Sequence, residues 1–351
     1  MKRIGACALG IVTCMASFAQ RKEAVKLVRD DANKKVDIYI GGQLFTRFLY
    51  PDTLEKPVLY PVIAADGAVV TRGYPLKPLA GDPTDHPHHI GIWFNYENVN
   101  GLDFWNNSFA IPASKKSQYG WIKTHTLVGT GNSSTSDGAQ VGSLSYRANW
   151  TNQQGEVLLE ENTTLEFSGS PSLRVIDRVT TLKAVTDVLF KDAKDGLLGM
   201  RIAHALQLPT RQDQKFTDDK GNVTIVKGGS DNIPTGNYLT SEGKEGDSAW
   251  STRGSWCKLY GKMGADSIAI VMIDHPSNPN YPTYWHARGY GLFAANPLGE
   301  AIFSNGKRTK NLHLAKGESV VFRYRIVIDN GKRTIRPEQI EMLAGEFAKK
   351  H

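Results

Sequence analysis

The sequence predicts an all-β fold, a large antiparallel β-sandwich that ends in one short helix. Apolar residues alternate with polar ones over long stretches, turn pairs such as Asn-Gly and Asp-Gly separate these stretches, and no amphipathic helix stands between them. Strands that alternated with helices would instead indicate a parallel sheet. The 351 residues, 40% of them hydrophobic, can fill one large core, so we expect a single sandwich domain over residues 20–351.

The individual strands are predicted from a period of two in their apolar residues, because side chains on a strand point to alternate faces. Long strands are expected at 144–150, 157–167 and 320–328, and shorter ones at 36–40, 58–63, 90–94, 172–182 and 267–274. The turn pairs are Gly41-Gly42, Asp66-Gly67, Asp137-Gly138, Asp195-Gly196, Asn305-Gly306 and Asn330-Gly331. Many such strands without intervening helices favour antiparallel pairing.

Two segments depart from the strand pattern. Residues 337–350 predict the C-terminal helix, since Pro337 suits a first helical position and apolar residues follow it at spacings of three and four. We expect this helix to cap the sheet. Residues 209–255 are polar and rich in Gly, Asp, Thr and Lys, which predicts a long binding loop or lid, with a disordered insertion as the alternative.

Residues 1–19 have the pattern of a secretory signal peptide, with two cationic residues, an apolar run and a small-x-small cleavage site that ends at Ala19. We expect export to the periplasm or the medium, and a lipoprotein signal that ends at Cys14 is the alternative. Cleavage after Ala19 would leave Cys257 as the single cysteine and would lower the net charge from +7 to +5. An intramolecular disulfide is then excluded.

The charge pattern and the missing motifs exclude several classes of protein. The basic residues are not clustered, which argues against nucleic-acid binding. No segment after the signal peptide approaches the roughly 18 uninterrupted apolar residues of a transmembrane helix, so we expect no membrane span. The sequence contains no GxGxxG, GxxxxGK[ST], HExxH, GxSxG or CxxC motif, so dinucleotide, nucleoside triphosphate, zincin and serine-hydrolase functions have no support.

Residues 85–105, DHPHHIGIWFNYENVNGLDFW, contain the densest group of ionisable rings. If the chain is extended there, His86 and His88 project to one face and could ligate a divalent metal ion, while His89 projects to the other. A structural interpretation has Asp85 capping a turn and the histidines bonded to the backbone.

The same stretch also suits acid–base chemistry on a sugar. An imidazole transfers protons well near neutral pH, and nearby carboxylates can orient it or share the proton. The carboxylates close in sequence are Asp85, Glu97 and Asp103. Aromatic residues such as Trp105 interleave with amides such as Asn95, a mixture that can stack on a sugar ring and bond its hydroxyls. Alternate aromatic residues in a core are the structural alternative.

Residues 274–299, DHPSNPNYPTYWHARGYGLFAANPLG, form a second dense stretch, and we expect its prolines to prevent regular structure. It contains His286, Arg288 and Asn296 among several rings, including Tyr284. A stiff loop of this composition is a suitable wall for an anionic or polyhydroxyl ligand. A packed structural loop is the alternative.

Together with TSEGKEGDSAWSTRGSWCKLYG from Thr240, these two stretches resemble the bacterial PmoA-like proteins, which are named methane oxygenases and have no assigned function. The resemblance covers roughly residues 30–330, although the family usually has Arg after the histidine group, where this chain has Ile90. It implies an exported protein with a fold similar to the galactose-mutarotase-like β-supersandwich. Residues that match the family's blocks are Asp85, His86, His88, His89, Asn95, Asp103, Trp105, Glu242, Trp250, Arg253, His286, Arg288 and Asn296.

We therefore expect an exported enzyme that opens, epimerises or cleaves a glycoside by acid–base chemistry, as a hydrolase, lyase or epimerase. His88 or His286 would carry the proton and Arg288 would steady negative charge. The catalytic candidates are His86, His88, His89, Glu242, His286 and Arg288, and the substrate-binding candidates are Asp85, Asn95, Glu97, Asp103, Trp105, Trp250, Arg253, Tyr284 and Asn296. A non-catalytic glycan-binding protein is one alternative. The other is a metal-dependent enzyme with His86 and His88 as ligands, although we expect no cofactor.

Overall fold

The computed structural model describes residues 23–79, 82–134, 138, 140–210, 213–217, 223–226, 234–331 and 334–350. The predicted signal peptide, residues 1–19, and the alternative lipoprotein site at Cys14 lie outside this part of the chain. Within it, no helix has both the length and the apolar character needed to cross a membrane.

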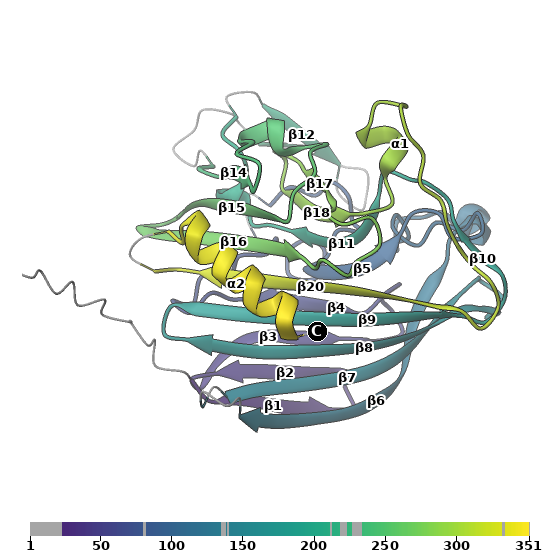
Figure 1. Ribbon diagram of the computed structural model, residues 1–351, viewed down its shortest axis with the longest axis horizontal. Helices are drawn as coiled ribbons and strands as arrows, with labels where there is room; N and C mark the ends of the chain where they lie inside the picture. Colours follow the sequence, from purple (N-terminus) through teal and green to yellow (C-terminus); the bar gives the residue numbers. More distant parts are fainter. Residues whose placement is uncertain are drawn as a thin grey trace, which may run out of the picture.

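Two eight-stranded antiparallel sheets face each other, as Figure 1 shows. In order, the first sheet contains β1 (Val25–Asp30), β2 (Lys35–Ile40), β3 (Gln43–Leu49), β4 (Val58–Val62), β5 (Ile92–Tyr96), β11 (Gly196–Arg201), β18 (Leu292–Asn296) and β17 (Tyr284–Ala287). The second contains β14 (Asn237–Thr240), β15 (Trp256–Met263), β16 (Asp266–Asp274), β20 (Ser319–Asp329), β9 (Leu173–Ala184), β8 (Val157–Ser170), β7 (Gln140–Thr151) and β6 (Trp121–Ser134). The predicted antiparallel sandwich is confirmed.

Short elements complete the described part of the chain. They are the strand pairs β10 (Val188–Phe190) with β19 (Leu312–Leu314) and β12 (Gln214–Thr217) with β13 (Val223–Val226), the helices α1 (Glu300–Phe303) and α2 (Pro337–Lys350), and the 3-10 turns η1 (Ala113–Gln118), η2 (His204–Leu206) and η3 (Gly246–Ala249). The helix α2 has the predicted bounds.

The main hydrophobic core lies between the two sheets. Phe94 of β5 packs on Phe322 of β20 with ring centroids 5.9 Å apart, and Phe45 of β3 meets Phe167 of β8 at 6.3 Å. Glu161 is also buried there, but its carboxylate accepts hydrogen bonds from Tyr146, Trp150 and Arg178, among others. A buried charge is tolerated when it is paired and hydrogen-bonded in this way.

The helix α2 covers the outer face of the second sheet, which Figure 1 shows in yellow across the strands. Ile340 and Phe347 are fully buried on that helix and join a second core with Val271, Ile273 and Val327 of the sheet. The apolar spacing that predicts the helix therefore also predicts which of its faces is buried.

The structure corrects three of the predictions about secondary structure. The strand expected at 90–94 begins at Ile92, because Gly91 has a φ of +55° and stands so close to β4 that a Cβ atom there would lie 2.1 Å from the Leu59 carbonyl oxygen. Residues 274–299 contain the hairpin β17–β18 rather than irregular structure, since all the prolines of this stretch lie outside the two strands.

The third correction concerns residues 209–255, for which the sequence predicts a long loop or lid. The described part of this segment includes strand β14, which pairs with β15 at the edge of the second sheet, followed by the turn η3. Tyr238 and Thr240 of β14 are buried while the residues beside them are half-buried. An alternation of only four residues is too short to detect from sequence.

Candidate functional site

The candidate site lies on the outer face of the first sheet. Trp93, Gly199, Ala294 and His286 pair with one another across the neighbouring strands β5, β11, β18 and β17. Their strand neighbours point into the main core, so alternation directs this row outward. Gly199 is required here, because a Cβ atom would lie 2.5 Å from Trp93 Cζ2 and 2.8 Å from Trp105 Cη2.

The predicted histidine group forms a turn on this face. His89 donates a backbone hydrogen bond to the His86 carbonyl, and His86 has a φ of +47°. The expectation that His86 and His88 project together from an extended chain is therefore wrong. Pro87 cannot donate to a β-ladder, which favours the turn over a strand.

Four rings stack in sequence above the sheet. Tyr290 lies on His86 at 5.2 Å, His86 on His89 at 4.9 Å, and His89 on Trp93 at 5.1 Å, each with nearly parallel planes. Trp105 meets the edge of Trp93 at 5.1 Å. The stack runs from the buried Trp93 through His89 and His86 to Tyr290, and the side chain of His86 is 42% exposed.

Two buried arginines hold the histidine turn in place. Asp85 Oδ1 lies 3.0 Å from Arg72 Nη1 and 2.7 Å from Arg201 Nη2, and its other oxygen bonds to His86 Nδ1. Arg72 also donates to the carbonyl groups of Pro83, Asp85, His86 and His89. Burial acts to raise the pKa of Asp85, but the His86 hydrogen bond and the two guanidinium groups outweigh it and hold that pKa far below its usual range.

His88 and His89 are poorly suited to proton transfer or to metal binding. Both are buried, and burial together with neighbouring positive charges holds their pKa values well below the usual range. Lys56 is buried too, and its ammonium group donates to the His88 carbonyl. A divalent cation at these rings would face Lys56, Arg72 and Arg201, and in the described part of the chain no group of three or more His, Cys, Asp or Glu is arranged to hold a metal ion. The positive charges around His88 and His89 therefore disfavour a divalent metal ion at these two rings.

Asp195 and His286 form a second acid–histidine pair on the same face. Asp195 directly precedes β11, and its Oδ1 lies 3.4 Å from His286 Nδ1. Burial raises the pKa of Asp195 to about 6, an effect that the charge of Glu97 increases and the charge of Lys194 opposes. Burial, together with the charges of Lys194 and Arg288, lowers the pKa of His286 to about 3. The pair is therefore a neutral imidazole beside a carboxyl group that exchanges its proton near pH 6.

Polar side chains from the predicted set surround this pair. Glu97 accepts a hydrogen bond from the Asp195 backbone at 3.0 Å, and Asn296 donates to the carbonyls of Ala193 and Lys194, which fixes the loop that carries Asp195. Burial also raises the pKa of Asp103. Within the described residues, His286 Nδ1, Asn95 Oδ1 and Trp250 Nε1 are buried without a hydrogen-bond partner. Buried atoms without a partner also lie away from this site, such as Thr46 Oγ1 of β3, so these three do not identify the site by themselves.

A pocket of about 520 Å³ is lined by Ala287, which follows His286 at the end of β17, and by Arg288 and Tyr290 of the β17–β18 turn. Trp250 and Asp247 line it from the side of η3. The Arg288 guanidinium lies over the Trp250 ring at 5.3 Å and over the Tyr290 ring at 5.8 Å. This volume is in the range of small-molecule sites.

Comparison with known proteins supplies the family. A family model described as a family of unknown function, DUF6807, matches residues 35–344. The chain belongs to this family. The search of curated proteins found no match.

Several solved structures match over most of this chain at 9–11% identity. The galactosidase domain of the alpha-galactosidase-sucrose kinase AgaSK matches 87% of this chain and 42% of its own, with a TM-score of 0.38. A putative aldose 1-epimerase from Escherichia coli K12 matches 88% of this chain over 100% of its own length, with a TM-score of 0.30. A galactose mutarotase-like protein from Clostridium acetobutylicum matches 88% of this chain over 99% of its own length, with a TM-score of 0.32. This chain thus spans less than half of the first of these, and scores below 0.5 carry no conclusion about function.

Three of the predicted residues have other partners and do not contact the acid–histidine pairs. Glu242 is exposed in the turn after β14 and accepts a hydrogen bond from Ser241. Arg253 donates to the carbonyls of Asn280 and Pro282, and Tyr284 donates to Glu300. Arg253 and Tyr284 therefore stabilise the loops around β17.

Residues that the sequence did not single out complete the site. Asp195 was expected only as part of the turn Asp195-Gly196, and Arg72 and Arg201 carried no motif. The sequence offered one indirect sign of their role. Asp195 stands directly before β11 and Arg201 is the last residue of that strand, so β11 connects the Asp195–His286 pair to the Asp85–His86 pair. Tyr290 lies in a predicted block, but its stacking on His86 could not be predicted without the turn geometry.

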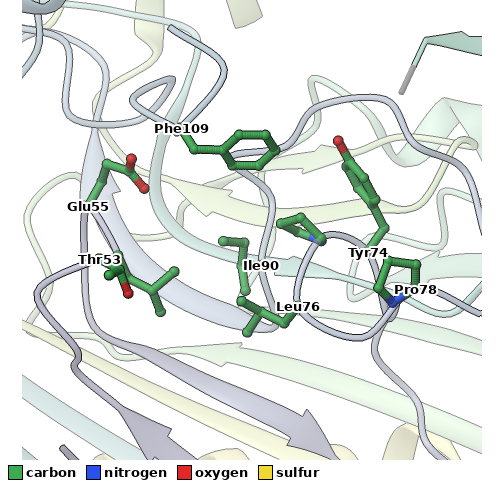
Figure 2. A pocket seen from close by; sticks show the side chains of 9 residues that line it. Thr53, Glu55, Tyr74, Leu76, Pro78, Ile90 and Phe109 are labelled. Carbon is green, nitrogen blue, oxygen red and sulfur yellow. The ribbon is translucent and has the colours of Figure 1, made fainter. Parts of the chain in front are cut away.

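A second pocket of about 230 Å³ lies on the other side of the histidine turn. Figure 2 shows Phe109 across from Leu76 and Ile90, with Glu55 and Tyr74 at opposite sides. Its wall includes no histidine and has Glu55 as its carboxylate. Among the described residues, neither pocket is lined by a histidine, and Asp247 is the carboxylate of the larger one. Of the two, the larger pocket is the one lined by Arg288 and Tyr290, which interact electrostatically with His286 and Asp195.

Proposed function

We propose that this chain is a carbohydrate-active enzyme that binds a sugar or glycoside on the outer face of the first sheet and transfers a proton through Asp195. The observation that supports it is the position of Asp195, a buried carboxyl group 3.4 Å from a neutral His286 and near a pocket lined by Trp250, Arg288 and Tyr290. A carboxyl group with a pKa of about 6 can accept and return a proton at neutral pH. Rings with polar neighbours suit the two faces of a sugar.

The proton step that this geometry suits is the transfer of a sugar hydroxyl proton to the Asp195 carboxylate and its return to another oxygen of the same substrate. His286 stays neutral throughout, because its pKa of about 3 lies too low for it to hold a second proton at neutral pH. It would act as a hydrogen-bond partner that orients the carboxyl group or the substrate. This step balances for the opening of a free sugar, in which the anomeric hydroxyl group loses a proton and the ring oxygen gains one. Cleavage of a glycoside would instead require the protonated Asp195 to donate its proton to the glycosidic oxygen while a water molecule adds to the anomeric carbon and returns a proton to Asp195.

This proposal changes the proton carrier that the sequence favours. His88 is 9% exposed, and His89 is 2% exposed, so neither offers its ring to a ligand on the sheet face. His86 is the exposed member of the group, and its ring lies between the rings of His89 and Tyr290. We assign the histidine turn to shaping one wall of the site.

A non-catalytic glycan-binding protein is a second candidate, and the four-ring stack favours it. A row of rings that ends at Tyr290, in the wall of the larger pocket, offers an aromatic contact to a ligand whether or not a bond is broken. Export, and the finer relationship to PmoA-like proteins, are part of the same proposal and rest on the sequence patterns.

The test is a screen of purified protein against neutral and acidic glycosides, followed by product analysis. We expect Asp195→Asn to lower turnover by about 10²- to 10⁴-fold. Glu242→Gln is the matched control, because it makes the same carboxylate-to-amide change at an exposed position, and it should keep full activity. Equal turnover by Asp195→Asn and the unmodified protein would overturn the role of Asp195. Ligand-induced stabilisation without any product would favour the binding protein instead.

A further inference from the structure

The guanidinium group of Arg288 has unused hydrogen-bonding capacity. It lies over the rings of Trp250 and Tyr290, and within the described part of the chain it makes no hydrogen bond or ion pair. A guanidinium group offers five N–H donors in a planar fork. A cation that lines a pocket with its donors free is available to a ligand.

The position of Arg288 is fixed from its backbone. Its N–H donates to the Leu292 carbonyl at 2.8 Å, and its own carbonyl accepts from Gly291 and from the Tyr238 hydroxyl. Gly291, with a φ of +97°, closes this turn. Because the backbone is fixed and two rings flank the side chain, little freedom is left to lose when a ligand binds.

The charges near Tyr290 add to the field of Arg288. Arg201 lies over the Tyr290 ring at 5.0 Å, and Arg72 and Arg201 share the single carboxylate of Asp85. That group of three therefore keeps one positive charge. Asp247 faces the same pocket, is exposed, and can accept hydrogen bonds from hydroxyl groups.

We propose that the pocket of Trp250, Arg288 and Tyr290 binds the carboxylate of an acidic sugar, a uronic acid or uronide. The planar fork of Arg288 matches a carboxylate with two parallel hydrogen bonds, a geometry that a single hydroxyl group cannot offer. The carboxylate of Asp247 would accept hydrogen bonds from the sugar's hydroxyl groups, and Leu208 and Pro209 supply an apolar wall. The inference rests on the proposed function, since it names the substrate class of the same site.

The experiment compares binding of glucuronic and galacturonic acid with binding of glucose, galactose and glucose 6-sulfate, measured by calorimetry on the whole protein. We expect each uronic acid to bind about 10- to 100-fold more tightly than its neutral counterpart. Arg288→Gln should remove this preference, and Arg288→Lys, which keeps the charge without the fork, should keep only part of it. Arg147→Gln, at an exposed position on β7 of the second sheet, is the matched control and should keep it fully.

Each other outcome is decisive. Equal binding of acidic and neutral sugars, with Arg288→Gln unchanged, would overturn the assignment of a carboxylate site and leave the proposed function standing. Binding of glucose 6-sulfate as tight as that of the uronic acids would replace the carboxylate with a general anion and overturn it as well. Absence of binding by every sugar, together with no turnover in the glycoside screen, would overturn both proposals.

Discussion

Two aspartates on one sheet face, each beside a histidine, have opposite electrostatic environments. Asp85 touches two buried guanidinium groups and the ring of His86, and these hold its pKa far below the usual range. Asp195 lies 3.4 Å from His286 and meets one lysine at 3.5 Å, and burial raises its pKa to about 6. The difference shows that the His86 hydrogen bond and two guanidinium groups make Asp85 a fixed charge, whereas burial with one lysine nearby leaves Asp195 able to carry a proton.

The two aspartates also differ in role, since Asp85 holds a turn in place and Asp195 is suited to proton transfer. Asp85 organises the turn through Arg72, which donates to several carbonyl groups of that turn. Asp195 has no arginine partner within the described part of the chain and retains a proton into the neutral range. Perturbed carboxyl groups of this second kind cluster at functional sites.

The largest effect is expected for Asp85→Asn. It would leave Arg72 and Arg201 buried without a counter-charge, which costs about 3–5 kcal/mol of the free energy of unfolding. Urea unfolding at pH 7 measures this, with Asp266→Asn at an exposed position of β16 as the control. A loss for Asp85→Asn no greater than that of the control would show that Asp85 does not neutralise the two arginines.

The second-largest effect is a gain in the free energy of unfolding, expected for Asp195→Asn. The folded state raises the pKa of Asp195 from 3.8 to about 6, so the folded state binds the proton more tightly than the unfolded state does. The contribution of Asp195 to stability is therefore present below about pH 4 and is lost as the pH rises to about 6. Asp195→Asn removes the buried charge and should stabilise the protein at pH 7–8 by up to about 3 kcal/mol.

Thermal unfolding of both proteins between pH 4 and pH 8 measures this difference. The Asp274 carboxyl group, whose pKa burial raises to about 7, titrates in both proteins and cancels in the comparison. A stability difference that does not change with pH would contradict the raised pKa of Asp195.

A smaller effect tests the strand that connects the two pairs. Gly199→Ala on β11 places a Cβ atom 2.5 Å from Trp93 and 2.8 Å from Trp105. We expect overpacking of about 1–3 kcal/mol and a change in tryptophan fluorescence as the two rings move. Gly129→Ala on β6, where a Cβ atom meets nothing within 4 Å, is the matched control. Equal stability of the two variants would show that the rings do not need the glycine.

The smallest effect is expected at the carboxylate outside both pairs. Glu242→Gln should change the free energy of unfolding by less than about 0.5 kcal/mol, because Glu242 is exposed and bonds only to Ser241 among the described residues. Urea unfolding checks this. A larger loss would mean that Glu242, like Asp85, makes interactions that stabilise the fold.

The fold followed from the sequence because long alternation is a property of the chain itself. The strands around 157–167 and 320–328 and the helix at 337–350 were predictable on that ground. The four residues of β14 were not, since short strands depend on a partner to be recognised.

The candidate site was predictable only in part. His286 and Arg288 lie in a stretch rich in aromatic and polar residues, and the histidines of the turn are close together in the sequence, so both groups could be predicted. Asp195, however, obtains its raised pKa from burial and from Glu97, almost a hundred residues earlier in the chain, and Asp85 obtains its lowered pKa from Arg72 and Arg201. These effects depend on strand register, which places distant residues beside one another.

The most direct test of the account is a titration of the aspartate side chains by carbon-13 NMR in the unmodified protein and in Asp195→Asn. We predict one carboxyl resonance that titrates near pH 6 and is missing from the variant, while Asp85 stays ionised well below pH 3.8. An Asp195 resonance that titrates near 3.8, as in an unfolded chain, would contradict the central claim that this carboxyl group is the site's proton carrier.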